Sequence, residues 1–165
     1  DLSDKAGKLL AEVLLKGLQG NRPVTLIGYS LGARVIFKCL EFLSKSDYKG
    51  ASTCLAANIV ERVVLLGAPI KIKDENWEAV RKIVAGRFVN VFSHHDWILG
   101  IAFRASLLTK GLAGIQAIDV PGIENVDASD VIEGHSSYLW STPQILDQLD
   151  LDVYFPVFRS SSAQS

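Results

Sequence analysis

VTLIGYSLGARVIFKCLEFL, residues Val24–Leu43, is the stretch that decides the fold. It begins with a short, almost continuous apolar run at 24–29. Such a run is typical of a strand that is buried on both faces of a parallel sheet. Beyond Ser30 the apolar residues recur at helical spacing, which indicates an amphipathic helix. The stretch therefore predicts a strand that turns into a helix at Ser30.

The turn itself, Gly28-Tyr29-Ser30-Leu31-Gly32, fits the pattern G-x-S-x-G. In this pattern, called the nucleophile elbow, a sharp strand-to-helix turn lifts a serine hydroxyl above the sheet. The serine backbone is strained there, and we expect a side chain at either glycine to collide with neighbouring chain. Three fixed positions are a weak signal alone, because Ser30 also fits an ordinary tight turn. The rest of the chain has to decide between the two.

The composition is that of an ordinary globular domain. Of the 165 residues, 48% are hydrophobic and 21% are charged, and the net charge is −1. A chain of this length can bury a core. Because Lys and Arg do not cluster, nucleic acid is not expected as a partner. The sequence contains no apolar run of membrane-spanning length and no signal-peptide pattern.

Two features indicate an internal part of an intracellular protein. Cys39 and Cys54 lack the spacing of a disulfide framework, which favours a reducing compartment. The chain begins at Asp1, directly in a helical pattern, so we interpret it as part of a longer chain. Residues 1–158 are expected to form one domain, and the Ser-rich residues 159–165 a flexible tail.

Strand and helix patterns alternate along the chain. This alternation is typical of βαβ units. We therefore expect an α/β fold, with a mostly parallel sheet and helices on both faces. The expected strands are 24–29, 62–66, 87–93 and either 115–120 or 123–131, and the expected helices are 2–18, 31–43, 76–85 and 143–149.

Candidate catalytic residues follow three of these strands. The carboxyl ends of parallel strands share one edge of the sheet, where such folds place their reactive groups. Ser30 follows the first strand, His94-His95-Asp96 the third, and His135 comes after the fourth. Hydrolases of the α/β class supply nucleophile, acid and base in the chain order Ser, Asp, His. Ser30, Asp96 and His135 are therefore the predicted catalytic set.

The acid has several alternatives. Asp96 also fits the N-cap of a helix that starts at Trp97. Asp74, after the second strand, competes with it as the acid, as do Asp127 and Asp130 in the last loop. Chain order and position at a strand end favour Asp96.

Other polar residues suggest a metal site or a head-group contact. Histidine is a common zinc ligand, so His94 and His95 suggest a metal site. Adjacent residues of a strand point to opposite faces, however, and beyond His135 the sequence has no further cluster of Cys or His. We therefore expect no metal and no cofactor. Arg34, one helical turn after Ser30, reaches a substrate head group or forms an ordinary ion pair.

Five segments resemble one known family. GYSLGARVIFKCLEFL, VVLLGAPI, FVNVFSHHDWILG, GIENVDASD and GHSSYLW are similar to the lipase-like family of transmembrane and coiled-coil domain-containing proteins. The resemblance covers nearly the whole chain. It implies the C-terminal part of an α/β-hydrolase domain, without the N-terminal strands of the full fold, and a triad of Ser30, Asp96 and His135. It also implies association with a membrane, at its cytosolic face, through segments outside this chain.

The predicted activity is hydrolysis of a carboxylic ester, a lipid or another hydrophobic ester, by a Ser-His-Asp triad. The backbone N–H of Leu31 is expected to donate one hydrogen bond to the oxyanion. The second donor normally follows an earlier strand, which this chain lacks, so we do not expect this part alone to be fully active. The elbow strand would also keep an unpaired apolar edge, which favours a dimer or pairing with the rest of the protein.

A different class of function is also open. The same fold without catalysis would serve as a platform for protein interaction or membrane trafficking. An intact Ser, Asp and His set argues against this alternative, because a platform needs none of the three. A nucleotide-binding domain is disfavoured, since residues 28–32 have neither the G-x-G-x-x-G spacing nor a P-loop lysine.

Overall fold

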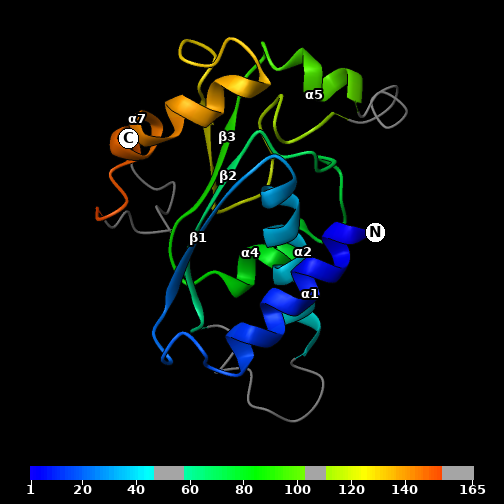
Figure 1. Cartoon of the computed structure of the whole chain (residues 1–165), viewed down its shortest axis with the longest axis vertical. Coiled ribbons are helices and arrows are strands. Elements are labelled where there is room, and N and C mark those ends of the chain that lie inside the picture. Colours follow the sequence, from blue (N-terminus) through cyan, green and yellow to red (C-terminus); the bar gives the residue numbers. More distant parts are fainter. Residues whose placement is uncertain (47–57, 103–110, 154–165) are drawn as a thin grey trace, which may run out of the picture.

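The described part of the chain is built on one parallel sheet. The structure is a computed structural model, and it describes residues 1–46, 58–102 and 111–153 (Figure 1). Its elements are α1 (Leu2–Leu15), β1 (Val24–Tyr29), α2 (Leu31–Ser46), β2 (Val60–Leu66), α4 (Trp77–Ile83), β3 (Phe88–Phe92), α5 (Trp97–Ala102), β4 (Ile123–Asp127), the 3-10 helix η2 (His135–Ser137) and α7 (Tyr138–Leu149). The expected tail at 159–165 and Cys54 lie outside the described residues.

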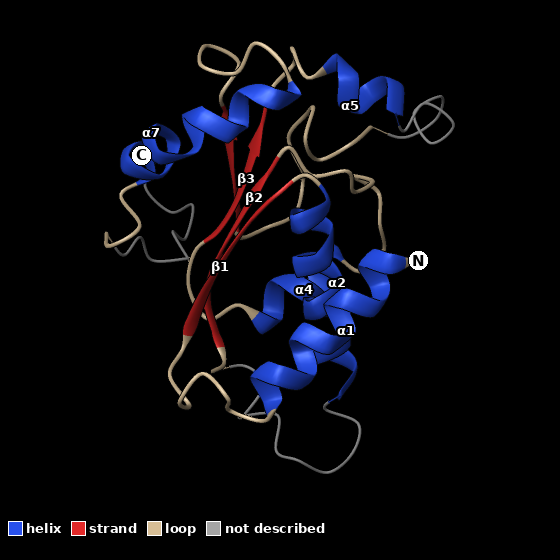
Figure 2. Ribbon diagram, viewed as in Figure 1, coloured by secondary structure: helices blue, strands red, loops and turns tan. Residues whose placement is uncertain are grey.

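The four strands are parallel and follow each other in the order β1-β2-β3-β4. Val63 of β2, for example, lies between Leu26 of β1 and Phe88 of β3. Within the described residues β1 pairs with one strand alone, so it is an edge strand. All four strands end at the same edge of the sheet, at the top of Figure 2. The predicted α/β fold with a parallel sheet is confirmed.

Helices cover both faces of this sheet. α1, α2 and α4 lie on one face and α7 on the other (Figure 1). Val63 and Leu65 are buried in the core cluster that contains Trp77 of α4. Val64 and Leu66 alternate with them and are buried in the cluster that contains Tyr138 of α7. The continuous apolar run of β2 therefore reflects burial on both faces of the sheet.

Several elements begin or end one to three residues from their predicted bounds, α5 was not among the expected helices, and two elements differ more. The fourth strand corresponds to the second of the two predicted alternatives, at Ile123–Asp127, and residues 115–120 form no strand. α7 begins at Tyr138, five residues before the predicted start at Pro143. The start was predicted too late because proline is common at the first position of a helix. In the structure Pro143 lies inside the helix, where it removes one hydrogen bond, to the carbonyl of Leu139.

Cys39 lies in the core on the face of the sheet that α2 covers. It is fully buried, and burial raises the pKa of its thiol to about 12. Because the thiolate is the reactive form, we expect iodoacetamide at pH 8 to leave Cys39 unmodified in the folded protein and to alkylate it in urea. Mass spectrometry of the Cys39 peptide measures both states. Rapid alkylation without urea would contradict the buried position.

Candidate active site

Ser30 occupies a sharp turn between β1 and α2. Its backbone has φ 54°, in the left-handed region that non-glycine residues rarely adopt. The Ser30 N–H donates to the carbonyl of Leu66 at 2.9 Å, and the Ser30 carbonyl accepts from the N–H of Arg34 at 3.3 Å. The turn is therefore held from β2 on one side and from α2 on the other. The predicted strain at this serine is confirmed, and such strain is typical of functional sites.

The two glycines of the turn differ in their surroundings. A Cβ atom at Gly28 would lie 2.6 Å from Ile36 Cδ1, 2.7 Å from the carbonyl carbon of Gly32 and 2.8 Å from the nitrogen of Ala33. A Cβ atom at Gly32 would meet nothing within 4 Å. The predicted collision therefore holds at Gly28 and is wrong at Gly32. The two positions differ because the Cβ direction at Gly28 leads toward the start of α2, whereas the Cβ direction at Gly32 leads away from α2 into open space.

This difference predicts opposite outcomes for two matched substitutions. Gly28→Ala is expected to lower the free energy of unfolding by about 1–3 kcal/mol, because backbone atoms must move to admit the methyl group. Gly32→Ala is expected to be neutral or to stabilise by up to about 1 kcal/mol, since alanine is the better helix former. Urea denaturation of both variants measures the effects. Equal destabilisation by the two would contradict the packing described here.

The structure brings Ser30, His135 and Asp96 together at the carboxyl edge of the sheet. The Ser30 Oγ lies 2.8 Å from His135 Nε2, across 105 residues of sequence. On the other side of the ring, His135 Nδ1 lies 2.7 Å from Asp96 Oδ2. With Nδ1–H donating to the carboxylate, Nε2 is free to accept the serine proton. The three side chains form one continuous hydrogen-bonded chain.

Asp96 is fixed by two partners at once. Its side chain is fully buried, with one carboxylate oxygen on His135 and the other accepting from the N–H of Leu99 at 3.2 Å. The second contact is a cap for α5, so the capping alternative and the contact with His135 coexist. The N–H of Asp96 donates to the Ser93 carbonyl at 3.2 Å, and the Ser93 hydroxyl donates to the Ile132 carbonyl at 3.0 Å. These bonds attach the Asp96 loop to the segment that precedes His135.

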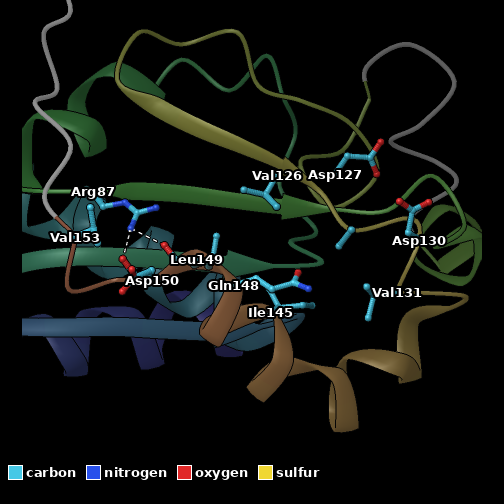
Figure 3. Close-up of a pocket in the computed structure, with 11 residues that line it drawn as sticks. Arg87, Val126, Asp127, Asp130, Val131, Ile145, Gln148, Leu149, Asp150 and Val153 are labelled. Atoms are coloured by element: carbon cyan, nitrogen blue, oxygen red, sulfur yellow. Dashed lines mark hydrogen bonds between the residues drawn. The ribbon is translucent and has the colours of Figure 1, made fainter.

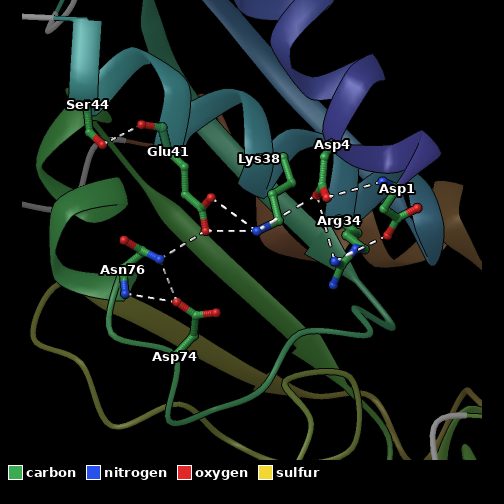
Figure 4. A network of polar contacts seen from close by, with 8 residues as sticks. All are labelled: Asp1, Asp4, Arg34, Lys38, Glu41, Ser44, Asp74 and Asn76. Atoms are coloured by element: carbon green, nitrogen blue, oxygen red, sulfur yellow. Dashed lines mark hydrogen bonds and ion pairs between the residues drawn. The ribbon is translucent and has the colours of Figure 1, made fainter.

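Asp74, one rival acid, is bonded elsewhere. Its carboxylate accepts from the backbone N–H and the side-chain amide of Asn76, at 2.9 and 3.0 Å (Figure 4). Arg34, in the same view, forms ion pairs with Asp1 at 3.4 Å and with Asp4 at 3.8 Å. Neither side chain is bonded to the imidazole of His135. Of the two roles considered for Arg34, the structure therefore shows the ordinary ion pair.

Asp127 and Asp130, the other rivals, line a cavity of about 560 Å³ between β4 and α7 (Figure 3). Asp127 accepts hydrogen bonds from the hydroxyl and the backbone N–H of Ser129, which lower the pKa of its carboxyl group. It also lies 3.7 Å from His94 Nε2. The residues that line this cavity do not include Ser30, Asp96 or His135. This cavity is therefore separate from the hydrogen-bonded chain of Ser30, His135 and Asp96.

His94 and His95 are exposed beyond the end of β3. Among the described residues, no group of three or more His, Cys, Asp or Glu side chains is placed to hold a metal ion.

Leu31 begins α2, and the first N–H groups of a helix have no acceptor within the helix. The N–H of Leu31 therefore lies next to the Ser30 hydroxyl without an intrahelical bond.

Tyr29 is a site residue that the sequence analysis did not select. Its hydroxyl donates to the backbone carbonyl of His135 at 2.9 Å, and its ring centroid lies 4.9 Å from that of the imidazole. Tyr29 occupies a variable position of the G-x-S-x-G pattern, so the pattern carries no information about it. Its place next to the serine, at the end of a strand that leads to the site, was the available signal.

Comparison with known proteins gives a family and several relatives. The family described as "Protein of unknown function (DUF726)" matches residues 1–152. The chain is 68% identical, over 99% of its length, to "Transmembrane and coiled-coil domain-containing protein STS1" of Oryza sativa subsp. japonica. It is 39% identical, over 93% of its length, to "Probable lipase MIL1" of Saccharomyces cerevisiae. It is also 42% identical, over 93% of its length, to an uncharacterized membrane protein of Schizosaccharomyces pombe.

The chain spans only part of these relatives. It covers 24% of the rice protein, 19% of the fission yeast protein and 14% of the budding yeast protein. No solved structure matches the chain. Within the described ranges, every helix is too short or too polar to span a lipid bilayer.

Proposed function

The chain belongs to the family described as "Protein of unknown function (DUF726)", and we propose that it carries the catalytic residues of a serine esterase or lipase. The observation that supports this proposal is the hydrogen-bonded chain from Ser30 Oγ through His135 to Asp96, with distances of 2.8 and 2.7 Å. Nucleophile, base and acid at these separations are what acyl transfer by a serine requires. The name of the yeast relative, probable lipase, agrees with it.

The proposed reaction proceeds in two steps. His135 Nε2 takes the proton as Ser30 Oγ attacks the acyl carbon, and the imidazolium then protonates the leaving alcohol, which releases an acyl-enzyme. Water attacks the acyl carbon in the second step, gives its proton to Nε2, and releases the acid as Ser30 regains its proton. Asp96 holds the Nδ1–H tautomer and stabilises the imidazolium, helped by its complete burial.

The oxyanion needs hydrogen-bond donors next to Ser30. The N–H of Leu31 is the proposed first donor, since it follows the nucleophile and begins α2. We propose that the second donor comes from outside the described residues. Loss of one such donor costs about a hundred- to a thousandfold in rate, so a longer natural chain is expected to be the better enzyme.

The surface next to the hydrogen-bonded chain favours a hydrophobic ester. Leu31 directly follows Ser30, and its side chain is 55% exposed. Leu139 and Trp140, shortly after His135, are 69% and 67% exposed. Exposed large apolar residues that lie close in sequence to reactive groups favour a site for an apolar ligand. We therefore propose that the acyl group of the substrate is apolar.

The full-length protein is proposed to act at a membrane. Two of the relatives carry transmembrane or membrane protein in their names. We propose that the membrane-binding segments lie outside residues 1–158, which form the hydrolase part. β1 is an edge strand among the described residues, and Ile27 on it is 42% exposed. We propose that this edge pairs with another part of the protein or with a second copy.

Hydrolysis of p-nitrophenyl esters by the full-length protein tests the proposal. Acyl chains from two to sixteen carbons separate a general esterase from one that prefers apolar acyl groups. We expect kcat/KM to rise with chain length and the activity to vanish in Ser30→Ala. A folded protein without activity on any of these esters would favour the alternative, a non-catalytic interaction platform.

A further inference from the structure

Tyr29 connects the strand of the nucleophile to the loop of the base. It is the last residue of β1 and directly precedes Ser30. Its hydroxyl donates to the backbone carbonyl of His135 at 2.9 Å, across 106 residues of sequence. One residue therefore joins the two segments whose separation determines the distance from Ser30 Oγ to His135 Nε2.

The ring of Tyr29 also supports the imidazole. The two rings lie 4.9 Å apart between centroids, at an angle of 35°. Tyr138 stands close to both, with centroids 5.5 Å from Tyr29 and 6.3 Å from His135. Tyr138 differs in one respect, because its buried hydroxyl has no hydrogen-bond partner among the described residues. Tyr138 thus fills space, whereas Tyr29 both fills space and forms a bond.

Besides the bond from Tyr29, the loop that carries His135 is held by hydrogen bonds from the Ser93 hydroxyl to the Ile132 carbonyl and from the Ser137 N–H to the Gly134 carbonyl, each 3.0 Å, and neither of these bonds involves His135 itself. Glu133 and Ser136, on either side of the Gly134-His135 pair, are exposed. A Cβ atom at Gly134 would meet nothing within 4 Å. Both ring nitrogens of His135 are occupied by Ser30 and Asp96, so the main chain has to be placed by other contacts. A displacement of about 1 Å in a catalytic group costs about a hundredfold in rate.

We propose that Tyr29 is a positioning residue, which holds the backbone and the ring of His135 so that Nε2 stays within hydrogen-bond reach of Ser30; this inference rests on the proposed serine-hydrolase function. Burial and the negative charge of Asp96 raise the pKa of the Tyr29 hydroxyl, so it stays protonated and able to donate at neutral and mildly basic pH.

Tyr29→Phe, Tyr29→Leu and the matched control Tyr138→Phe test this role in the full-length protein. Tyr29→Phe removes only the hydroxyl and is expected to lower kcat about 3- to 10-fold with KM unchanged. Tyr29→Leu also removes the ring contact and is expected to lower kcat about 10- to 100-fold. Tyr138→Phe removes a hydroxyl without a partner and is expected to leave kcat unchanged. Thermal unfolding of each variant reports on general packing.

A second readout does not depend on activity. Diethyl pyrocarbonate modifies imidazoles, and mass spectrometry gives the rate at each histidine. His135 is partly buried and bonded at both nitrogens, whereas His94 and His95 are exposed and serve as internal references. Tyr29→Phe is expected to raise the modification rate of His135 severalfold relative to these two. Tyr138→Phe is expected to leave that ratio unchanged.

The outcomes separate the two proposals. If Tyr29→Phe and Tyr138→Phe have the same kcat and the same rate of His135 modification, the positioning role is overturned. Equal losses in both variants, or a loss of kcat explained by a lower unfolding temperature, would also overturn it. If the wild-type protein hydrolyses no ester, the proposed function fails, and the modification rate of His135 alone then decides the role of Tyr29.

Discussion

Ser30→Ala is expected to lower kcat for ester hydrolysis by about 10⁴- to 10⁶-fold, because the acyl-enzyme cannot form without the hydroxyl. The loss should appear in kcat rather than in KM, since the hydroxyl acts on the reacting carbon. The fold should be unaffected: the Ser30 N–H and carbonyl are bonded to Leu66 and Arg34 through the main chain, which alanine retains. Steady-state kinetics and circular dichroism of the full-length variant measure both.

Ser136→Ala is the matched control for this substitution. Ser136 is an exposed serine that adjoins His135, so its replacement changes the same surface without touching the nucleophile. It is expected to leave kcat within about twofold, as surface substitutions usually do. Residual activity of Ser30→Ala above a hundredth of the wild type would contradict the proposed nucleophile.

Asp96→Asn is expected to lower kcat by about 10⁴-fold. Asparagine has the same size, and its amide oxygen can still accept from the Leu99 N–H that caps α5. The amide nitrogen cannot accept the Nδ1–H of His135, so the imidazole turns to the tautomer with the proton on Nε2. That tautomer cannot take the proton of Ser30. A loss of activity without a loss of stability is therefore the expected result.

Three further substitutions decide among the acids. Asp74→Asn, Asp127→Asn and Asp130→Asn are each expected to leave kcat within about threefold, because their carboxylates are bonded to Asn76, bonded to Ser129 or located in the cavity beside α7. A larger loss in any of the three than in Asp96→Asn would identify a different acid and contradict the structure.

Most of the architecture follows from hydrophobic periodicity. The apolar run at 24–29 matches β1 residue for residue. The burial on both faces that this run predicts is not seen in the described part of the chain, because β1 is an edge strand there and, of its six residues, Gly28 alone is buried while Ile27 is exposed. β4 was ambiguous, since Ile123 is the one buried residue of its five and a second apolar segment precedes it. The start of α7 was misplaced because Pro143 resembles a first residue and instead lies inside the helix.

Chain order and position at the strand ends were enough to predict the three residues of the hydrogen-bonded chain, but not their further contacts. Ser30, Asp96 and His135 could be selected because parallel strands deliver their carboxyl ends to one edge. The double use of Asp96, by His135 and by the Leu99 N–H, depends on side-chain geometry that no sequence pattern encodes. The same holds for Tyr29, whose contact with His135 joins positions 106 residues apart. The open space at Gly32 was equally invisible, because it depends on where the helix points.

Reaction of the folded full-length protein with a fluorophosphonate, followed by mass spectrometry of its peptides, tests whether Ser30 is an activated nucleophile. We predict an adduct on Ser30 that is absent from Ser30→Ala and forms far more slowly in His135→Ala, because the reagent reacts with a serine whose proton a nearby base can take. An unlabelled Ser30 in the folded protein, or an adduct on another serine, would contradict the proposed role of the Ser30, His135 and Asp96 chain.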